Sequence, residues 1–296
     1  MAAGAGALTS PGRLLVVALL VATAACKKSK PPPRVVPAAG ESAVLPRVAP
    51  GAPGSPRSSV RTIDVAGRSR RYVLVEPAAR PGAPIPLVLV FHGDGGDAPG
   101  FHRAWPFEGA TGDRAYLAYP EGIGHTWDLE TTRDNRDEAF VVALIDALAG
   151  SFPIDRGRLF ATGYSSGGFI ANVLACHRPG LFRAIASNAG GAPYNQLEKW
   201  GNGFPKCPGQ TPVAMLALHG ERDFGVTLDS GRFSAEYWAY VNGCKTDEME
   251  TTGYPECRVY RGCPAGKAVG FCSIGPLGHW IWEEAAVASW TFFERQ

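Results

Sequence analysis

One short segment limits which folds this chain can adopt more than any other. Residues 163–168 (GYSSGG) contain a G-x-S-x-G pentapeptide between the apolar runs 159–162 (LFAT) and 169–175 (FIANVLA). Strand, glycine-flanked serine and helix, in this order, are the layout of a sharp turn that lifts a serine clear of a sheet. We therefore expect Ser165 to be a nucleophile at the end of a strand. A glycine-rich turn without chemistry is the alternative.

Apolar runs of strand length alternate with helical patterns along the rest of the chain. Continuous apolar runs predict buried strands, and apolar residues at helical spacing predict helices. The expected strands are 71–75, 87–91, 115–119, 158–162, 183–187, 213–218 and 268–273, and the expected helices are 138–149, the serine helix to 176, 233–241 and 283–294. This alternation predicts an α/β fold, with a mainly parallel sheet covered by helices on both faces. A functional site then lies beyond the carboxyl ends of the strands.

A nucleophilic serine needs a histidine base, and the base needs an orienting acid. For a serine turn of this kind the order along the chain is serine, acid, histidine. Of the six histidines, only His279 follows a loop that could supply the acid. It lies between the last expected strand and the last expected helix. We therefore predict His279 as the base, with a solvent-exposed loop histidine as the alternative.

The acid is expected in the loop after the strand 213–218. Asp223 is best placed, because it begins the loop at the carboxyl end of that strand. Glu221 and Asp229 are the alternatives: Glu221 could pair with Arg222 at the surface, and Asp229 could cap the following helix.

Attack on a carbonyl places negative charge on its oxygen, which two backbone N–H groups must meet. One donor is expected from Ser166, directly after the nucleophile, and the other from the glycine-rich loop 91–96 (FHGDGG), where we assign it to Asp94. A phosphate-binding loop is the alternative, but the lysine and spacing of that motif are missing. His92 and His219 each precede a glycine at a strand end, and we expect both to make structural hydrogen bonds. Trp127 and Trp280 are candidate substrate-binding residues, with packing roles as the alternative.

With these residues placed, the chain resembles the secreted esterases of carbohydrate esterase family 1 and the related polyhydroxybutyrate depolymerases. The resemblance runs from about residue 71 to the C-terminus and rests on motifs that occur in the family's order. These are 91–93 with 95–96, 119–122 followed by Trp127, 158–168, 174–176, 219–220 with Asp223, 242–244, 260–263 and 278–280. The cysteine-rich end looks most like that of feruloyl esterases. The resemblance implies an α/β-hydrolase fold, ester hydrolysis without a metal or other cofactor, and Ser165, Asp223 and His279 as the triad.

Two departures concern the wall of the pocket. The family usually has Gly-His-x-Trp-Pro after the last strand, whereas residues 278–282 read GHWIW. After the acid, Val-Pro is common, whereas this chain has Val226-Thr227. Feruloyl or acetyl esters on polysaccharide and hydroxyalkanoate polyesters therefore all stay open as substrates. The alternative function is a catalytically idle α/β-hydrolase-fold binding module for cell-wall or plant polysaccharide. Peptide cleavage by the same triad is a further alternative.

The first 59 residues predict export. Residues 1–25 form a signal peptide, because the apolar run 14–25 follows Arg13 and is too short to span a bilayer. Cys26 follows two alanines, as in a lipoprotein signal, and is predicted to be lipidated; an ordinary signal peptide with an incidental cysteine is the alternative. Residues 26–59 are rich in proline and poor in large apolar residues, and so predict a disordered tether. The expected location is the bacterial cell envelope, as a lipoprotein of the periplasm or outer surface, or outside the cell, with residues 60–296 as the catalytic domain.

Six cysteines remain after Cys26: Cys176, Cys207, Cys244, Cys257, Cys263 and Cys272. An even number behind an export signal predicts three disulfides, whose pairing the sequence leaves open. A zinc site is the alternative, but it calls for close cysteine pairs that are absent. The net charge of +2 implies no nucleic-acid partner. The expected partners are an ester substrate and a membrane bound through the lipid on Cys26.

Overall fold

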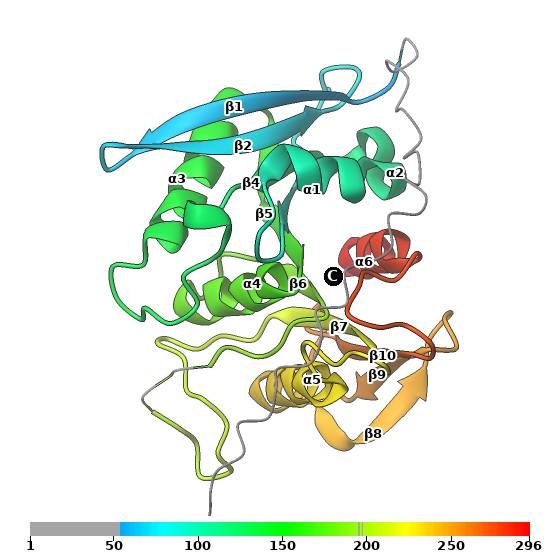
Figure 1. Ribbon diagram of the computed structural model, residues 1–296. Coiled ribbons are helices and arrows are strands. Elements are labelled where there is room, and N and C mark those ends of the chain that lie inside the picture. The colour runs from blue at the N-terminus through cyan, green and yellow to red at the C-terminus, as the bar shows by residue number, and fades with distance from the viewer. Residues whose placement is uncertain (1–53, 195, 197) are drawn as a thin grey trace, which may run out of the picture. The chain divides into compact units, whose positions relative to one another are not determined.

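A ten-stranded sheet runs through the part of the chain that the structure describes (Figure 1). The structure is a computed structural model that describes residues 54–194, 196 and 198–296. The predicted signal peptide, Cys26 and the tether as far as residue 53 lie outside the described residues. The first strand begins at Arg57, so residues 57–59 belong to the sheet and not to the predicted tether. No helix in the described ranges has the length and apolar character needed to cross a membrane.

The six central strands are parallel, and antiparallel strands extend the sheet at both edges. The strand order is β1-β2-β4-β3-β5-β6-β7-β10-β9-β8, and the parallel strands are β4, β3, β5, β6, β7 and β10. The bounds are β1 (Arg57–Val65), β2 (Arg68–Glu76), β3 (Ile85–Phe91), β4 (Tyr116–Pro120), β5 (Ile154–Tyr164), β6 (Ala184–Asn188), β7 (Ala214–Gly220), β8 (Lys245–Thr251), β9 (Cys257–Arg261) and β10 (Val269–Ile274). The predicted mainly parallel α/β sheet is confirmed.

Helices cover both faces of this sheet (Figure 1). The bounds are α1 (Ala98–Ala104), α2 (Glu108–Thr111), α3 (Arg136–Ser151), α4 (Ser166–His177), α5 (Leu228–Asn242) and α6 (Ala285–Glu294). One apolar core lies under α3, α4 and α5, and a second lies under α1 and α6. The side chains of β3 and β7 are buried along nearly their whole length, because helices pack on both sides of them.

Local sequence signals explain where the longer helices begin and end. The Asn135 side chain caps α3 by accepting hydrogen bonds from the N–H groups of Asp137 and Glu138. Helix α5 ends at Gly243, whose φ of 71° is in the left-handed region that glycine adopts without strain. Helix α1 has seven residues and contains Pro99 and Gly100, so its sequence has no helical period to detect.

Three disulfides link the described cysteines, as the even count predicts. They pair Cys176 with Cys207, Cys244 with Cys263, and Cys257 with Cys272. The last two join the β8–β9–β10 end of the sheet, where β8 is largely exposed and has little apolar surface to bury. Covalent links there compensate for a small core.

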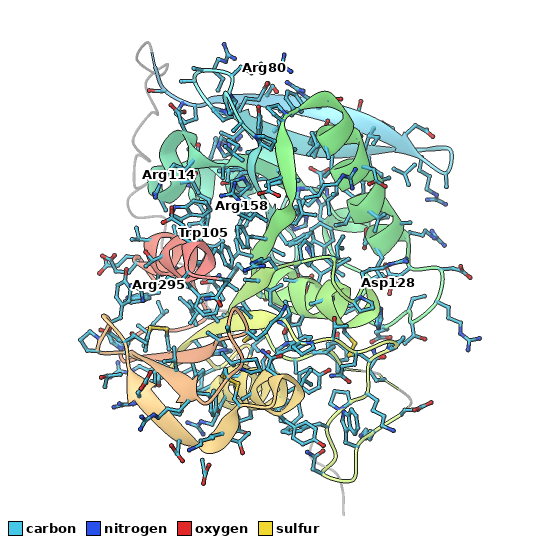
Figure 2. All side chains as sticks on the ribbon, turned by 180° about the vertical axis from the view of Figure 1, so that it is seen from behind. Arg80, Trp105, Arg114, Asp128, Arg158 and Arg295 are labelled. Atoms are coloured by element: carbon cyan, nitrogen blue, oxygen red, sulfur yellow. A yellow bond between two sulfur atoms is a disulfide. The ribbon has the colours of Figure 1, made fainter. Side chains whose placement is uncertain are left out.

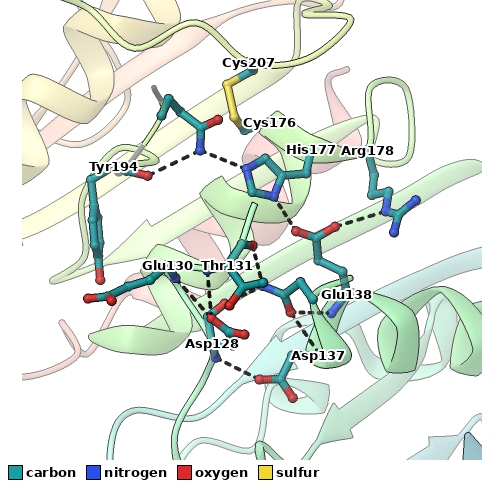
Figure 3. A network of polar contacts seen from close by, with 12 residues as sticks. Asp128, Glu130, Thr131, Asp137, Glu138, Cys176, His177, Arg178, Tyr194 and Cys207 are labelled. Carbon is teal, nitrogen blue, oxygen red and sulfur yellow. Dashed lines mark hydrogen bonds and ion pairs between the residues drawn. A yellow bond between two sulfur atoms is a disulfide. The ribbon is translucent and has the colours of Figure 1, made fainter. Parts of the chain in front are cut away.

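The first disulfide belongs to a polar network that fastens the loop after β6 to the body of the fold (Figure 3). His177 is hydrogen-bonded to Glu138 and to the side chain of Gln196, and Arg178 donates to the other oxygen of Glu138. The loop that this network holds also contains Tyr194, which packs on Phe169 of α4.

Charged side chains are spread over the surface. The arginines labelled in Figure 2 (Arg80, Arg114, Arg158 and Arg295) come from different segments of the chain, and Arg114 and Arg158 line one pocket with Glu294. Arg114 and Arg158 pair with Glu294 and Asp155. This pattern agrees with the small net charge.

Candidate active site

Ser165 lies in a strained turn between β5 and α4. Its φ of 54° and ψ of −121° are unusual for a residue with a side chain. A Cβ atom at Gly163 would lie 2.3 Å from the carbonyl oxygen of Gly167, and one at Gly167 would lie 2.2 Å from that of Phe91. Only glycine fits at these two positions. The sequence G-x-S-x-G therefore allows the turn to close against β3 and present Ser165 at the carboxyl end of the sheet.

The structure brings together the three residues predicted from their order in the sequence. The Ser165 hydroxyl oxygen is 2.9 Å from Nε2 of His279, and Nδ1 of His279 is 2.7 Å from Oδ2 of Asp223. A carboxylate can only accept hydrogen bonds, so Nδ1 of His279 carries the proton and Nε2 is free to accept from Ser165. The alternatives for the acid lie elsewhere, since Glu221 accepts from Ser273 and Asp229 pairs with Arg232.

The Asp223 carboxylate is buried, and it accepts three hydrogen bonds and lies close to a second imidazole. Oδ1 accepts from the N–H groups of Gly225 and Val226, both at 2.9 Å. Oδ2 accepts from His279 and lies 3.2 Å from Nε2 of His219. Burial raises the pKa of Asp223, but the hydrogen bonds from His279, Val226 and Gly225 together outweigh it, and the pKa is lowered. Asp223 is therefore a carboxylate at neutral pH.

His219 closes the loop that carries Asp223. Its side chain is 1% exposed, and Nε2 lies 2.7 Å from the carbonyl oxygen of Val226, so Nε2 carries the proton. Burial lowers the pKa of the His219 imidazole more than the Val226 carbonyl and Asp223 raise it. The predicted structural hydrogen bond of His219 is confirmed. The sequence did not predict that His219 lies beside Asp223.

The two predicted oxyanion donors face no competing acceptor. Within residues 54–194, 196 and 198–296, the N–H groups of Asp94 and Ser166 donate to no other group. The glycine loop that carries Asp94 reaches the turn itself, because a Cβ atom at Gly93 would lie 3.3 Å from Cβ of Ser165. This geometry fits the predicted role of both N–H groups.

Residues 122–127 hold the glycine loop in place. Gly95 N–H donates to the carbonyl oxygen of His125 at 2.8 Å, and the Thr126 hydroxyl donates to Oδ1 of Asp94 at 2.6 Å. Gly122 N–H donates to Nε2 of His92, whose Nδ1 therefore carries a proton and donates to the Gly93 carbonyl at 2.8 Å. The predicted structural role of His92 is confirmed. Burial lowers its pKa and keeps it neutral.

Trp127 packs against the glycine loop. Its side chain is buried, at 4% exposure, and it contacts Phe91 edge to face. Its Nε1–H donates to the carbonyl oxygen of His92 at 2.8 Å. These contacts favour the packing role, which the sequence left open as the alternative, over the predicted contact with a substrate.

Trp280 lies where a substrate could reach it. It is 59% exposed and contacts Tyr164 at a ring-centroid distance of 5.5 Å. With Tyr164 it lines a groove of about 450 Å³ that starts at the glycine loop. Besides Gly93 and Gly96, the other lining residues are mostly aromatic or aliphatic, with two carboxylates: Asp94, Phe101, Ala104, Trp105, Ile281, Trp282 and Glu283.

Tyr194 lies among acidic side chains. It packs edge to face on Phe169 of α4, the helix that follows Ser165, at 5.5 Å. Burial raises the pKa of Tyr194, and the nearby charges of Glu130, Asp94 and Asp128 raise it further.

Comparisons with known proteins agree with this geometry. Residues 120–201, which contain β5 and the Ser165 turn, match the model of the prolyl oligopeptidase family. A protein of Nocardia uniformis subsp. tsuyamanensis, provisionally named as the esterase NocK, is 33% identical over 71% of this chain and 63% of its own length. Feruloyl esterase C of Emericella nidulans is 28% identical over 61% of this chain and 64% of its own length. The solved structure of acetyl xylan esterase from Aspergillus awamori superposes with a TM-score of 0.64 and 16% identity, covering 80% of this chain and all of that one.

The chain has an α/β-hydrolase fold and is similar in sequence to feruloyl esterases. The fold rests on the solved structure, and the relation to feruloyl esterases rests on the sequence matches. The alignments cover slightly less than two thirds of the length of NocK and of feruloyl esterase C.

The described residues contain no group of three or more His, Cys, Asp or Glu side chains arranged to hold a metal ion.

Proposed function

We propose that this chain is a serine esterase that hydrolyses carboxylic esters through an acyl-enzyme. The observation that carries the proposal is the continuous relay from Ser165 through His279 to Asp223, with contacts of 2.9 and 2.7 Å. A serine hydroxyl is a poor nucleophile at neutral pH, and such a relay is the arrangement that activates it.

In the acylation step, Ser165 Oγ attacks the ester carbonyl carbon while its proton moves to Nε2 of His279. The charge on the carbonyl oxygen is met by the N–H groups of Ser166 and Asp94, which have no other acceptor among the described residues. His279 then gives the proton to the departing alcohol oxygen as the C–O bond breaks. Asp223 holds Nδ1 of His279 and stabilises the imidazolium that forms.

Water completes the cycle. It attacks the acyl-enzyme carbonyl and gives one proton to His279, which passes it to Ser165 Oγ as the acid departs. The cycle consumes one ester and one water and yields one acid and one alcohol, and it needs no cofactor.

The proposed substrates are feruloyl or acetyl esters of polysaccharide, with hydroxyalkanoate polyesters as the alternative. The names of the relatives support the first class. The groove beside the glycine loop has the aromatic lining that suits an apolar acyl group. The carboxylates of Asp94 and Glu283 in the groove suit an alcohol that carries further hydroxyl groups.

Export and a lipid anchor on Cys26 are part of the proposal. Three disulfides support an oxidising compartment. Partition into detergent and mass spectrometry of the purified chain test the anchor, which Cys26→Ser should abolish.

The decisive experiment is labelling with a fluorophosphonate probe. The wild-type protein and Ser151→Ala, an exposed serine on α3, should be labelled, whereas Ser165→Ala should not. A folded wild-type protein that is neither labelled nor able to turn over p-nitrophenyl acetate would rule out the mechanism and favour the idle binding module. Methyl ferulate, acetylated xylan and polyhydroxybutyrate then separate the substrates, and a prolyl peptide anilide tests the peptidase activity that the match to residues 120–201 raises.

A further inference from the structure

Four arginine side chains line one pocket beside the turn between β1 and β2. They come from β2 (Arg68 and Arg70), from the first residue of α3 (Arg136) and from the residue after α4 (Arg178). The pocket has a volume of about 420 Å³ and shares no lining residue with the groove of Trp280. It is called the arginine pocket below, and the candidate triad does not use it.

The fold brings these side chains together around the start of α3. Side chains alternate between the two faces of a strand, so Arg68 and Arg70 share one face of β2. Helix α3 covers that face, because Arg70 contacts Asp137 and Phe140 of this helix. The two arginines of β2 therefore face the first turn of α3, where Arg136 lies.

Two of the four guanidinium groups are fixed in place. Arg70 is 5% exposed, donates to Oδ1 of Asp137 at 2.6 Å and lies over the ring of Phe140 at 4.0 Å. Arg178 donates from Nε to Glu138 at 3.1 Å (Figure 3). A carboxylate balances the charge of each group, so these two arginines give the pocket a rigid wall but no surplus charge.

The other two guanidinium groups supply charge that no direct contact balances. Arg68 and Arg136 are exposed, and neither forms an ion pair with a carboxylate that the structure describes. Arg136 is also the first residue of α3, where the positive end of the helix dipole makes a further cation unfavourable. Its backbone N–H donates to no other group in the described ranges. Together these features favour an anion in this part of the pocket.

We infer that the arginine pocket binds a phosphate monoester, carried either by a small soluble molecule or by a lipid head group. Guanidinium groups stay charged at physiological pH and hold phosphate oxygens through paired N–H donors. The pocket has the size of a small-molecule site, for which volumes of about 300–1,000 Å³ are usual. It therefore has room for the carbon atoms next to the phosphate group as well.

The two unbalanced arginines favour a phosphate monoester over a carboxylate. At neutral pH a phosphate monoester carries about two negative charges and three strong acceptor oxygens. It can therefore meet Arg68 and Arg136 at the same time, while a third oxygen remains for the wall of the pocket. A carboxylate has one charge and two oxygens, and leaves one of these arginines without a partner.

Asp134 offers a test with the opposite sign. Within the described residues it is the one carboxylate that lines the pocket, and its charge opposes an anionic ligand. Asp134→Asn removes this charge without strain, because the φ of 55° is a left-handed conformation that asparagine also adopts. We expect this variant to bind the ligand about threefold more tightly or better. The control Asp247→Asn, at an exposed position on β8, should change nothing, and weaker binding by Asp134→Asn would contradict the inference.

Titration calorimetry of the full chain with glycerol 3-phosphate is the main experiment. Arg68→Gln and Arg136→Gln should each weaken binding about tenfold, since each removes a charge-assisted contact. Arg80→Gln, which removes an exposed arginine outside the pocket (Figure 2), should leave binding unchanged. Equal losses in Arg136→Gln and Arg80→Gln would reduce the effect to net charge and overturn the inference. Acetate bound as tightly as glycerol 3-phosphate would overturn it too.

Vesicle binding separates the two sources of the phosphate group. The Cys26→Ser variant is used, so that a lipid on Cys26 does not supply the attachment. Binding to phosphatidylcholine vesicles that contain phosphatidic acid, lost in Arg136→Gln, assigns the pocket to a lipid head group, whereas binding to glycerol 3-phosphate alone assigns it to a soluble ligand. A protein that binds neither probe, or binds phosphatidylglycerol vesicles equally well with and without Arg136→Gln, refutes the inference. Ser165→Ala should bind like the wild type, so the result is independent of the proposed function.

Discussion

The hydroxyl group of Tyr164 donates a 2.8 Å hydrogen bond to the carbonyl oxygen of His279. The bond joins the turn of the candidate nucleophile to the loop of the candidate base, two segments that approach each other only in the folded chain. The Tyr164 ring also lies 5.2 Å from the imidazole. The x residue of G-x-S-x-G thus restrains the base.

Replacing Tyr164 by phenylalanine should slow turnover while leaving the fold intact. The ring keeps its packing, but the loop of His279 loses one hydrogen bond, which is worth about 1 kcal/mol. We expect kcat on p-nitrophenyl acetate to fall about threefold to tenfold with little change in KM. A kcat within twofold of the wild type would show that packing alone positions the loop.

Replacing Asp223 by asparagine should cost far more. The variant loses the charge that stabilises the imidazolium and orients His279, and loss of such a carboxylate elsewhere lowers kcat by about 10⁴-fold. Fluorophosphonate labelling should slow in parallel. A loss below about tenfold would point to a different acid.

The lowered pKa of Asp223 also predicts how the stability of the protein depends on pH. Because this pKa lies below the ordinary value of about 3.9, the ionised form contributes stability above that pH and loses it as the pH falls through the lowered value. The difference in melting temperature between wild type and Asp223→Asn should therefore shrink below about pH 4. A difference that is independent of pH would mean that the carboxylate network contributes nothing.

His219 should matter through its Nε2 proton. His219→Leu leaves the carbonyl oxygen of Val226 without its donor and removes the imidazole beside Oδ2 of Asp223, and we expect kcat to fall about tenfold or more. His219→Gln, which can place an N–H near the same point, should recover most of it. Equal activity in His219→Leu and His219→Gln would contradict a role for the Nε2 proton.

Trp127 offers a test of the glycine loop. Trp127→Phe keeps an aromatic ring under the loop but removes the hydrogen bond to the carbonyl of His92. The expected result is a fall in kcat of about tenfold, since the N–H of Asp94 is then held less firmly. A change in KM with kcat preserved would instead return Trp127 to substrate binding.

The residues of the candidate site could be predicted from sequence because the sheet topology dictates where they meet. Parallel strands deliver their carboxyl ends to one edge, so the residues after β5, β7 and β10 meet there whatever their distance along the chain. The order along the chain excluded the other histidines and favoured Asp223 as the acid. In the structure, His279 is hydrogen-bonded to both Ser165 and Asp223.

Side-chain direction was beyond the reach of the sequence. The sequence shows only that Trp127 follows a strand at the end of the sheet where the site lies. The direction of its indole, which donates to the carbonyl oxygen of His92, depends on the fold. The same holds for His219, whose contact with Asp223 depends on the path of residues 220–226.

Weakly apolar elements were also missed. Strand β8 reads KTDEMET and is mostly exposed, so no alternation of buried residues marks it. Strand β1 pairs only with β2 and is half exposed. The pairing of cysteines depends on the register of these strands, as Cys257 lies opposite Cys272 in the β9–β10 pair.

That register has a consequence for how the protein matures. Strand β10 leads directly into the loop of His279, and its link to β9 is covalent once Cys257 and Cys272 are joined. The strand that precedes the candidate base is thus held by one covalent link in addition to its hydrogen bonds with β7 and β9. A chain kept reduced would hold β10 by those hydrogen bonds alone, so we expect the segment that carries His279 to be less stable before Cys257 and Cys272 are joined.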